Sequence, residues 1–356
     1  MAKPRPEKFV PPLTVTEGDY VFASPDMRGR LNKHGKPWTV RTIFVYNVQQ
    51  VVYRNNKRHA KRAKPVSEAT KSHRFIECRA MEHDLHNLGY RLTLPTHIRQ
   101  KHVKALTRYW ESREDLKPSS VIQKVSILRT FLGWMGKQGV MEFMTPADMF
   151  ASPERMKRDY VSREDKSWDT KTDPMQLIEA VRQKNKFVAD QLMLSYLFGL
   201  RAKETWLFRP RKDYIPKENI IHVRRGTKGG RPRTVPISSE AQIAFLKELL
   251  SRTHHVEDSM TPRTTPVKAW KSTYYRITRL FGISRAEGLT PHGLRHGYAH
   301  KVYQELSGHP AAVRDLTSSK AVLDMIEDRI ARLIVSENLG HNRESISSAY
   351  IGPRHK

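Results

Sequence analysis

Cysteine is almost absent from this chain, in which Cys78 is the only one. An intrachain disulfide is therefore excluded, and so is a zinc site built from several thiolates. No stretch approaches the ~20 consecutive apolar residues that a membrane-spanning helix requires. The first residues, Met1 to Pro6, also lack the apolar run of a signal peptide. We therefore expect Cys78 to be a buried core side chain, and the protein to be soluble and to act inside the cell.

Acidic residues are scarce relative to basic ones. The 356 residues include 64 Lys and Arg against 36 Asp and Glu, which gives a formal net charge of +28. An excess of this size indicates a long polyanion as partner. Charge alone leaves a ribosomal or other structural RNA-binding protein open. Because 38% of the residues are hydrophobic and recur at helical spacing, a disordered chain is excluded.

The N-terminal part of the sequence predicts an extension followed by a helical bundle. Residues 1–37 are rich in Pro, Gly and charge with little periodicity, and we interpret them as an arm or loosely folded extension. Apolar residues at helical spacing then predict a small all-α domain over 38–150. Its four expected helices begin near Trp38, at Ser67, near Pro95 and at Ser119 or Ser120, and the second ends at Gly89. The basic run 54–62 is either a phosphate-contacting segment or a solvated face.

The remainder of the chain predicts a linker and a second domain. Residues 151–172 are polar, and we interpret them as the linker. Asp173 before Pro174 is typical of a helix start, and it opens a mainly helical domain over 173–356. Two short strands, 220–223 and 234–237, flank a Gly-rich turn and predict a small antiparallel sheet. Further helices are expected at Val267–Phe281, after Thr290-Pro291, and at Ala321–Val335. In the last of these we expect an inward face made of Val322, Met325, Ile326, Ile330 and Leu333.

Several residues of the second domain could carry chemistry. His292 and Arg295 stand at i and i+3 in the first turn of an expected helix, so both can reach one phosphate at its N-terminus. Arg201 follows a long apolar helix, and Lys228 lies in the Gly-rich turn. Taken singly, each has an ordinary structural explanation, such as an ion pair between Arg201 and Glu204 at i+3.

The combination of these residues favours phosphodiester chemistry. A phosphate attacked by an oxygen nucleophile gains charge on its non-bridging oxygens, and guanidinium and imidazole N–H groups can hold that charge without a metal. The late Tyr350 could supply the nucleophile if a base or a cationic site activates its hydroxyl, whose ordinary pKa is about 10. A lysine on a turn could protonate the leaving oxygen. We see no spacing typical of a metal site and predict neither metal nor cofactor.

The chain resembles the tyrosine recombinases of the phage integrase family, and specifically the integrases of mobile elements, over about residues 40–351. Four ordered boxes carry the resemblance. They are Gly199-Leu200-Arg201-Ala202-Lys203-Glu204, the hairpin segment Thr227 to Pro236, His292-Gly293-Leu294-Arg295-His296, and Leu339-Gly340-His341 followed by Tyr350.

The resemblance implies a helical core-binding domain, a catalytic domain and a role for each site residue. Tyr350 would attack the scissile phosphate to give a 3′-phosphotyrosine and a free 5′-hydroxyl. Arg201 and Arg295 would hold the phosphate, and Lys228 would protonate the leaving oxygen. His341 would donate a hydrogen bond to the phosphate, while His292 would serve in acid–base work or hold the tyrosine.

The resemblance also implies the wider function. We expect two domains that clamp duplex DNA attachment sites, a homotetramer on synapsed DNA, and directionality or DNA-bending factors as further partners. The protein would be cytoplasmic and nucleoid-associated, and bacterial or phage-derived. The interval between Arg295 and His341 is longer than in compact relatives, and only six residues follow Tyr350. Two alternatives stay open: a non-cleaving DNA-binding protein of the same fold, and a resolvase or type IB topoisomerase using the same chemistry.

Overall fold

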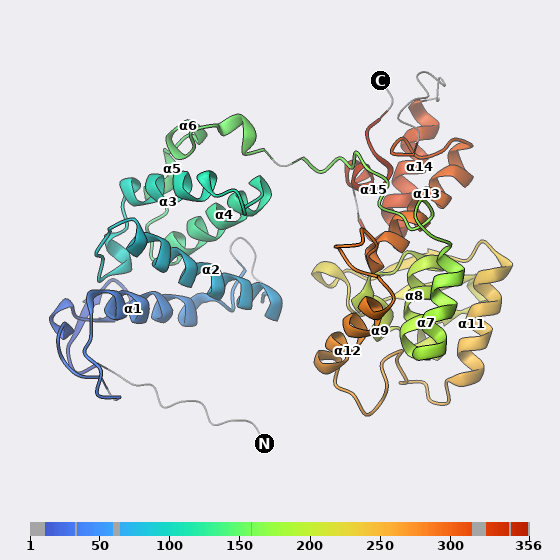
Figure 1. Ribbon diagram of the computed structural model, residues 1–356, viewed down its shortest axis with the longest axis horizontal. Coiled ribbons are helices and arrows are strands. Elements are labelled where there is room, and N and C mark those ends of the chain that lie inside the picture. The colour runs from blue at the N-terminus through green and yellow to red at the C-terminus, as the bar shows by residue number, and fades with distance from the viewer. Residues whose placement is uncertain are drawn as a thin grey trace. The chain divides into compact units, whose positions relative to one another are not determined.

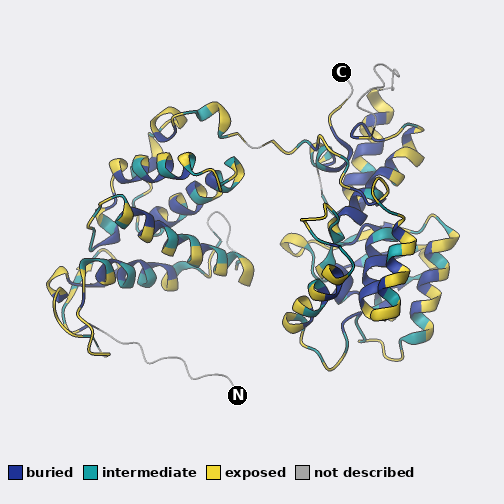
Figure 2. Ribbon diagram, viewed as in Figure 1, coloured by how far each residue is buried: buried dark blue, intermediate teal, exposed yellow. Residues whose placement is uncertain are grey.

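The computed structural model of the chain describes residues 11–32, 34–59, 65–157, 159–314, 325–341 and 343–354. The chain divides into two compact units, an N-terminal unit over 1–159 and a C-terminal unit over 160–356. Each has its own hydrophobic core (Figures 1 and 2). Within the described part of the chain, no helix combines the length and the apolar character needed to cross a membrane.

The N-terminal unit is a helical bundle with a small hairpin. Its helices are α1 (Val40–Asn55), α2 (Glu68–Asn87), α3 (Gln100–Ser112), α4 (Pro118–Trp134) and the short α5 (Gly139–Glu142) and α6 (Pro146–Met149). Short 3-10 turns lie at Pro25–Met27, Pro95–His97 and Pro153–Arg155. The long helices bury their apolar stripes against one another, with Trp110 and Phe131 among the fully buried side chains. Cys78 is buried here, as predicted.

Residues 11–37 differ from the loosely folded extension that we expected. They form an antiparallel hairpin of β1 (Thr14–Glu17) and β2 (Tyr20–Ala23). Buried Asn47 on α1 ties the hairpin down, because its side chain accepts from the Ala23 N–H at 2.7 Å and donates to the Ala23 carbonyl at 3.0 Å. Phe22 and Met27 are fully buried. Buried apolar side chains of a short segment therefore anchor what composition alone describes as an arm. Residues 1–10 lie outside the described part.

The predicted helix starts agree with the structure at α1 and α2 and are displaced at α3 and α4. Ser67 caps α2 by accepting from the Thr70 N–H, as its position predicts. The α3 helix begins only at Gln100, because Pro95–His97 forms a separate 3-10 turn. The α4 helix begins at Pro118 rather than at Ser119 or Ser120, since proline is favoured in the first turn and leaves both serines inside the helix.

The C-terminal unit is mainly helical around a three-stranded sheet. Its longer helices are α7 (Pro174–Lys184), α8 (Lys186–Phe198), α11 (Glu240–Arg252), α12 (Val267–Leu280), α13 (Pro291–Ser307) and α14 (Met325–Asn338). Its short helices are α9 (Ala202–Leu207), α10 (Pro210–Asp213) and α15 (Ser348–Ile351), with 3-10 turns at Pro216–Glu218, Lys228–Gly230 and Glu344–Ile346. The sheet order is β3 (Tyr214–Ile215), β4 (Ile220–Val223), β5 (Arg233–Pro236), all antiparallel. The mainly helical fold and the predicted hairpin are confirmed.

Helices α8 and α13 form the centre of this unit and lie against each other. Nine of the thirteen residues of α8 are buried, and Figure 2 shows the helix coloured mostly as buried. The segment before α7 belongs to this core as well. Trp168 is 1% exposed, and its indole N–H donates to the Thr290 carbonyl at 2.7 Å. Part of the predicted linker 151–172 is thus packed at the N-terminus of α13.

The expected inward face of the helix at 321–335 is wrong. Val322 lies outside the described residues, and the other four side chains of that face are exposed: Met325 85%, Ile326 67%, Ile330 53% and Leu333 41%. The face of α14 that packs on α13 instead carries Ala331, Val335 and an ion pair between Asp328 and Arg332. This pair is satisfied internally, because Asp328 also accepts from the Tyr303 hydroxyl at 2.6 Å. Counting apolar residues therefore selected the wrong side of the helix.

Candidate active site

The first arginine of the site lies at a break between two helices. The α8 helix ends at Phe198 and is capped by Gly199, which has φ +63° and ψ 24°. A side chain there would be strained, and its Cβ would lie 2.9 Å from Cε1 of Tyr298 and 3.0 Å from a methyl of Leu339. Arg201 then precedes α9, and its backbone N–H donates to the Glu204 carboxylate at 2.8 Å. The turn therefore directs the Arg201 side chain toward α13 and the C-terminal segment.

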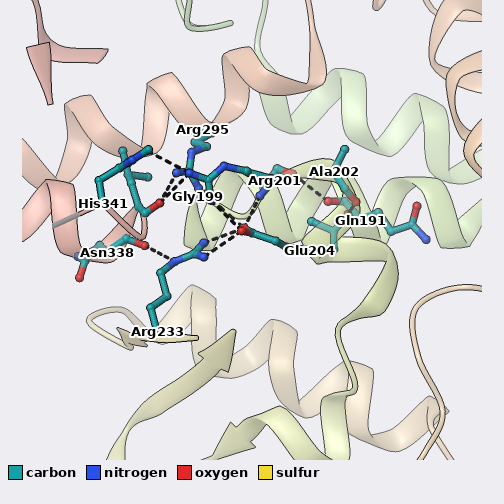
Figure 3. Close-up of polar contacts among 12 residues, drawn as sticks. Gln191, Gly199, Arg201, Ala202, Glu204, Arg233, Arg295, Asn338 and His341 are labelled. Atoms are coloured by element: carbon teal, nitrogen blue, oxygen red, sulfur yellow. Dashed lines mark hydrogen bonds and ion pairs between the residues drawn. The ribbon is translucent and has the colours of Figure 1, made fainter. Parts of the chain in front are cut away.

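Glu204 is the centre of a cluster of arginines (Figure 3). Its carboxylate is fully buried and accepts from Arg201 Nη1 at 2.8 Å and from both terminal nitrogens of Arg233 at 3.0 and 2.8 Å. Arg295 Nη1 lies 3.9 Å away. Burial by itself would raise the pKa of Glu204, but the hydrogen bonds and charge of Arg233 and the charges of Arg201 and Arg295 lower it to about 2. Glu204 is therefore a fixed anion that holds the guanidiniums together.

Arg295 reaches the same place from the first turn of α13 and is fully buried. Its Nη1 donates to the Gly199 carbonyl at 2.5 Å, and its Nη2 donates to the Leu339 carbonyl. Its Nε donates to the Tyr350 hydroxyl at 3.2 Å. Burial, partly offset by Tyr350, lowers the pKa of Arg295 to about 10. The guanidinium stays charged at neutral pH and points one N–H at the tyrosine oxygen.

His341 completes the polar centre. Arg201 Nη2 lies 3.1 Å from the Leu339 carbonyl and 3.0 Å from His341 Nε2. Because a guanidinium can only donate, His341 Nε2 accepts, and the neutral ring carries its hydrogen on Nδ1. Burial and the charges of Arg201 and Arg295 lower the pKa of His341 to about 4. His341 is therefore neutral near pH 7, with Nδ1–H as its donor.

Tyr350 lies against three histidines of α13. The ring of Tyr350 is 5.8 Å from that of His292 and 4.8 Å from that of His296, measured between centroids. His300 contacts the backbone of Tyr350 instead of its ring, with Nε2 2.8 Å from the carbonyl oxygen. Burial, together with neighbouring His292 and His300, lowers the pKa of His296 to about 3. The tyrosine is thus 6% exposed and enclosed by Arg295 and neutral imidazoles.

A sequence profile described as Integrase matches residues 161–301 of this chain. The XerA tyrosine recombinase of Pyrococcus furiosus is 27% identical over 184 residues, which cover 48% of this chain and 63% of that protein. XerA of Thermococcus kodakarensis is 26% identical over 198 residues, covering 52% of this chain and 64% of that protein. The chain thus spans just under two thirds of the length of these relatives. Over this stretch the chain is similar to the tyrosine recombinases.

Solved recombinase structures share the fold. An integrase of the transposon Tn1549, in complex with circular-intermediate DNA, aligns with a TM-score of 0.52 at 14% identity. That alignment covers 88% of this chain and 95% of the other. The XerH recombinase bound to its palindromic difH substrate aligns with a TM-score of 0.53 at 13% identity, covering 88% and 93%. At such low identity the likeness establishes the tyrosine recombinase fold and leaves the site to be argued from its own geometry.

Five of the six predicted site residues lie together. Arg201 and Arg295 both donate to the Leu339 carbonyl, and Arg201 also donates to His341. Tyr350 is bonded to Arg295, and His292 lies beside the Tyr350 ring. The sixth, Lys228, lies exposed on the loop between β4 and β5. It is close enough for its charge to help lower the pKa of His341. The long interval before His341 does not keep the last box away from the others.

Sequence reasoning missed three residues of the site. Arg233 stands in the hairpin segment Thr227 to Pro236. A basic residue besides Lys228 in that segment was the available signal for its bidentate contact with Glu204. His296 and His300 follow His292 at i+4 and i+8, which places all three on one face of α13. That helical spacing was the available signal, and the rings reach Tyr350 as it predicts.

Proposed function

We propose that this protein is a site-specific DNA recombinase that cuts and rejoins DNA through a covalent 3′-phosphotyrosine at Tyr350. The observation that carries the proposal is the Tyr350 hydroxyl 3.2 Å from Nε of Arg295, in a cluster of three arginines gathered on Glu204. A tyrosine beside a concentration of positive charge is suited to attack an anionic phosphodiester.

In the proposed step, the Tyr350 oxygen forms a bond to phosphorus and the bond from phosphorus to the 5′ oxygen breaks. Arg201 and Arg295 balance the charge that develops on the non-bridging oxygens. The phenol proton passes to a base, for which His292 is the candidate because it is neutral and lies beside the ring. Lys228 delivers a proton to the leaving 5′ oxygen from its loop.

His341 can act in this step in a defined way. With Nε2 occupied by Arg201, its Nδ1–H is the group that can donate to a phosphate oxygen. The religation step reverses these proton transfers with a different 5′-hydroxyl. No external energy source is needed, because the phosphotyrosine conserves the bond energy.

The substrate in this proposal is duplex DNA at the attachment sites of a mobile element. The net charge of +28 supplies phosphate affinity, and the separate N-terminal unit is proposed as the core-binding half of a clamp. The Tn1549 integrase, whose structure contains a transposon's circular intermediate, supports an integrase role. A homotetramer on two synapsed sites is the assembly proposed for recombination.

The experiment is a suicide-substrate assay on nicked duplexes drawn from the ends of the element that encodes the protein. Wild type is expected to give a covalent protein–DNA band on a denaturing gel, and Tyr350→Phe none, although both bind the DNA. Tyr298→Phe, which alters a buried tyrosine of the same unit, should keep the band. If wild type binds these duplexes tightly and never becomes attached, the protein is a non-cleaving DNA-binding protein of this fold.

A second assay separates recombination from the other uses of this chemistry. Wild type is expected to join two such sites placed on different plasmids. Relaxation of supercoiled plasmid without joined products would instead indicate a topoisomerase-like activity. Binding should weaken with salt with a slope of about −0.9 per phosphate contact.

A further inference from the structure

His300 makes a contact that the proposed chemistry leaves unexplained. The residue is 1% exposed, and its Nε2 lies 2.8 Å from the backbone carbonyl of Tyr350. Tyr350 lies in α15, a helix of only four residues. One turn of helix is unstable by itself, so tertiary contacts must hold this turn.

Arg314 favours the tautomer of His300 that this hydrogen bond needs. Arg314 Nε lies 2.9 Å from Nδ1 of His300 and also 3.0 Å from the Asp165 carboxylate. Arg314 Nε has one hydrogen, which Asp165 and Nδ1 share, and Asp165 Oδ1 lies 3.6 Å from Nδ1. The Tyr350 carbonyl can only accept and the guanidinium can only donate, so the neutral imidazole carries its hydrogen on Nε2 and Nδ1 accepts. That hydrogen can only be donated to the Tyr350 carbonyl. Arg314 therefore favours the tautomer that holds the tyrosine.

Arg314 is itself anchored to the segment that precedes α7. Its Nη2 donates to the Ser167 hydroxyl at 3.0 Å and to the Asp169 carboxylate. A continuous series of hydrogen bonds thus runs from Asp165, Ser167 and Asp169 through Arg314 and His300 to the backbone of Tyr350. All of its members belong to the C-terminal unit.

Neighbouring carbonyls of the same segment are also held from outside it. The Ser348 carbonyl accepts from the Ser162 N–H at 2.9 Å, and the Ile351 carbonyl accepts from the Val313 N–H at 2.9 Å. Arg332 Nη1 donates to the Gly352 carbonyl at 3.1 Å. The contact of His300 differs from these because it falls on the nucleophile residue itself. It therefore sets the rotation of α15 that directs the phenol ring between Arg295 and His296.

We propose that His300, oriented by Arg314, is a positioning residue for Tyr350. The inference rests on the proposed function, since it assigns His300 a role in presenting the nucleophile. His300 does not touch the reacting atoms and acts through the backbone of Tyr350. Because a displacement of about 1 Å at a reacting group can lower a rate about 100-fold, the loss of this contact should slow attack without weakening DNA binding.

The test compares His300→Phe, which fills the space but cannot donate, with His300→Gln, whose side-chain amide can still donate to the Tyr350 carbonyl. The readout is the single-turnover rate of covalent complex formation on the nicked duplex at saturating protein. We expect His300→Phe to be about 10- to 100-fold slower, His300→Gln to recover most of the rate, and both to keep wild-type DNA affinity. Arg314→Met, at a partly exposed position, should slow the reaction several-fold and add little to His300→Phe.

A matched control shows whether any lost buried hydrogen bond has the same effect. Thr261→Val removes a buried hydrogen bond to the Trp206 carbonyl, 2.9 Å long and away from Tyr350. It should lower the melting temperature and leave the cleavage rate unchanged. If Thr261→Val and His300→Phe lose rate in proportion to their loss of stability, or if His300→Gln rescues nothing, His300 has only a structural role.

A substrate with sulfur in place of the 5′-bridging oxygen tests which step is affected. A thiolate leaves without needing a proton, so this DNA should restore the cleavage rate of Lys228→Ala and should not restore that of His300→Phe. If it restored the rate of His300→Phe, the defect would lie in the departure of the leaving group, and a role in positioning the nucleophile would be overturned.

Amide hydrogen exchange separates failure of this inference from failure of the proposed function. Independent of any cleavage, His300→Phe should speed exchange in the segment 347–352 and leave α8 and α11 protected. Unchanged exchange there would overturn the positioning role. A wild type that forms no covalent complex, with exchange changed as expected, would instead overturn the proposed chemistry and retain the contact.

Discussion

Replacing Glu204 by glutamine tests the central electrostatic feature of the site. Glu204→Gln keeps the size of the side chain and removes the charge that faces Arg201, Arg233 and Arg295. These guanidiniums would then repel one another at a place where Glu204 and Arg295 are fully buried. Removing one partner from a buried ion pair lowers the free energy of unfolding by about 3–5 kcal/mol. This is a large part of the ~5–15 kcal/mol by which a typical domain is stable.

The assay is thermal unfolding of the C-terminal unit, followed by circular dichroism and checked by urea titration. For a unit of this size each kcal/mol lowers the melting temperature by about 2–4 °C, so we expect a decrease of roughly 6–20 °C. Glu248→Gln is the control, because Glu248 pairs with Arg252 at 3.1 Å on the surface of α11. It should change stability by less than about 0.5 kcal/mol.

The pH dependence gives the same test a second outcome. The pKa of Glu204 is lowered from 4.5 to about 2 in the folded protein. The stabilisation by its charge is therefore present above pH 4.5 and is lost as the pH falls toward 2. The difference between wild type and Glu204→Gln should shrink over that range. A loss of unfolding free energy below about 1 kcal/mol at pH 7, or a loss that does not depend on pH, would refute the role of Glu204 as the counter-charge of the cluster.

Three further predictions follow from the described contacts. Gly199→Ala should lower the free energy of unfolding, measured in urea, by about 1–3 kcal/mol more than Gly308→Ala. Both glycines have positive φ, but only Gly199 has Tyr298 and Leu339 within reach of a new Cβ. Equal losses of stability would contradict the crowding argument. Cys78 should resist thiol reagents at pH 8 until the protein unfolds, since burial raises its pKa to about 12; fast reaction of the folded protein would show an accessible thiol. His296 and His341 should show no titration between pH 5 and 8 in NMR spectra, because their pKa values are lowered to about 3 and about 4. The stability that their neutral forms contribute is present above pH ~6.5 and declines as the pH falls below it. A titration midpoint near pH ~6.5 for either ring would contradict the burial of that ring.

Local signals in the sequence predicted much of the fold. Asp173 before Pro174, Ser67 before α2, and the Gly-rich turn between β4 and β5 each act within a few residues, and the structure confirms them. The candidate site was predicted from similar local signals, because Arg201, His292 and Arg295 stand in short motifs near the ends of helices. Their chemical roles, like the boundaries assigned to the domains, stay predictions.

Long-range compensation was not predictable from the sequence. The inner face of α14 is polar because Asp328 and Arg332 satisfy each other, Tyr303 and the Gly352 carbonyl, and none of these pairings follows from periodicity. The hairpin at 14–23 depends on Asn47, which reads as an ordinary polar residue of α1 until its partners are known. Helical spacing and the hairpin motif point to His300 and Arg233, but the partners of these two residues are equally long-range. Each is identified by what it contacts far along the chain.

The arginine cluster has a consequence for the strength of the proposed binding to DNA. A free arginine side chain carries about 2 kcal/mol of rotamer entropy, and ordering such a side chain at an interface usually weakens binding by ~0.5–1.5 kcal/mol. Arg201, Arg233 and Arg295 are already ordered by Glu204 and by carbonyls of the chain. The entropy lost in fixing them belongs to folding, so it is absent from the free energy of binding. A scissile phosphate would therefore gain more affinity from these three cations than from the same number of mobile surface arginines.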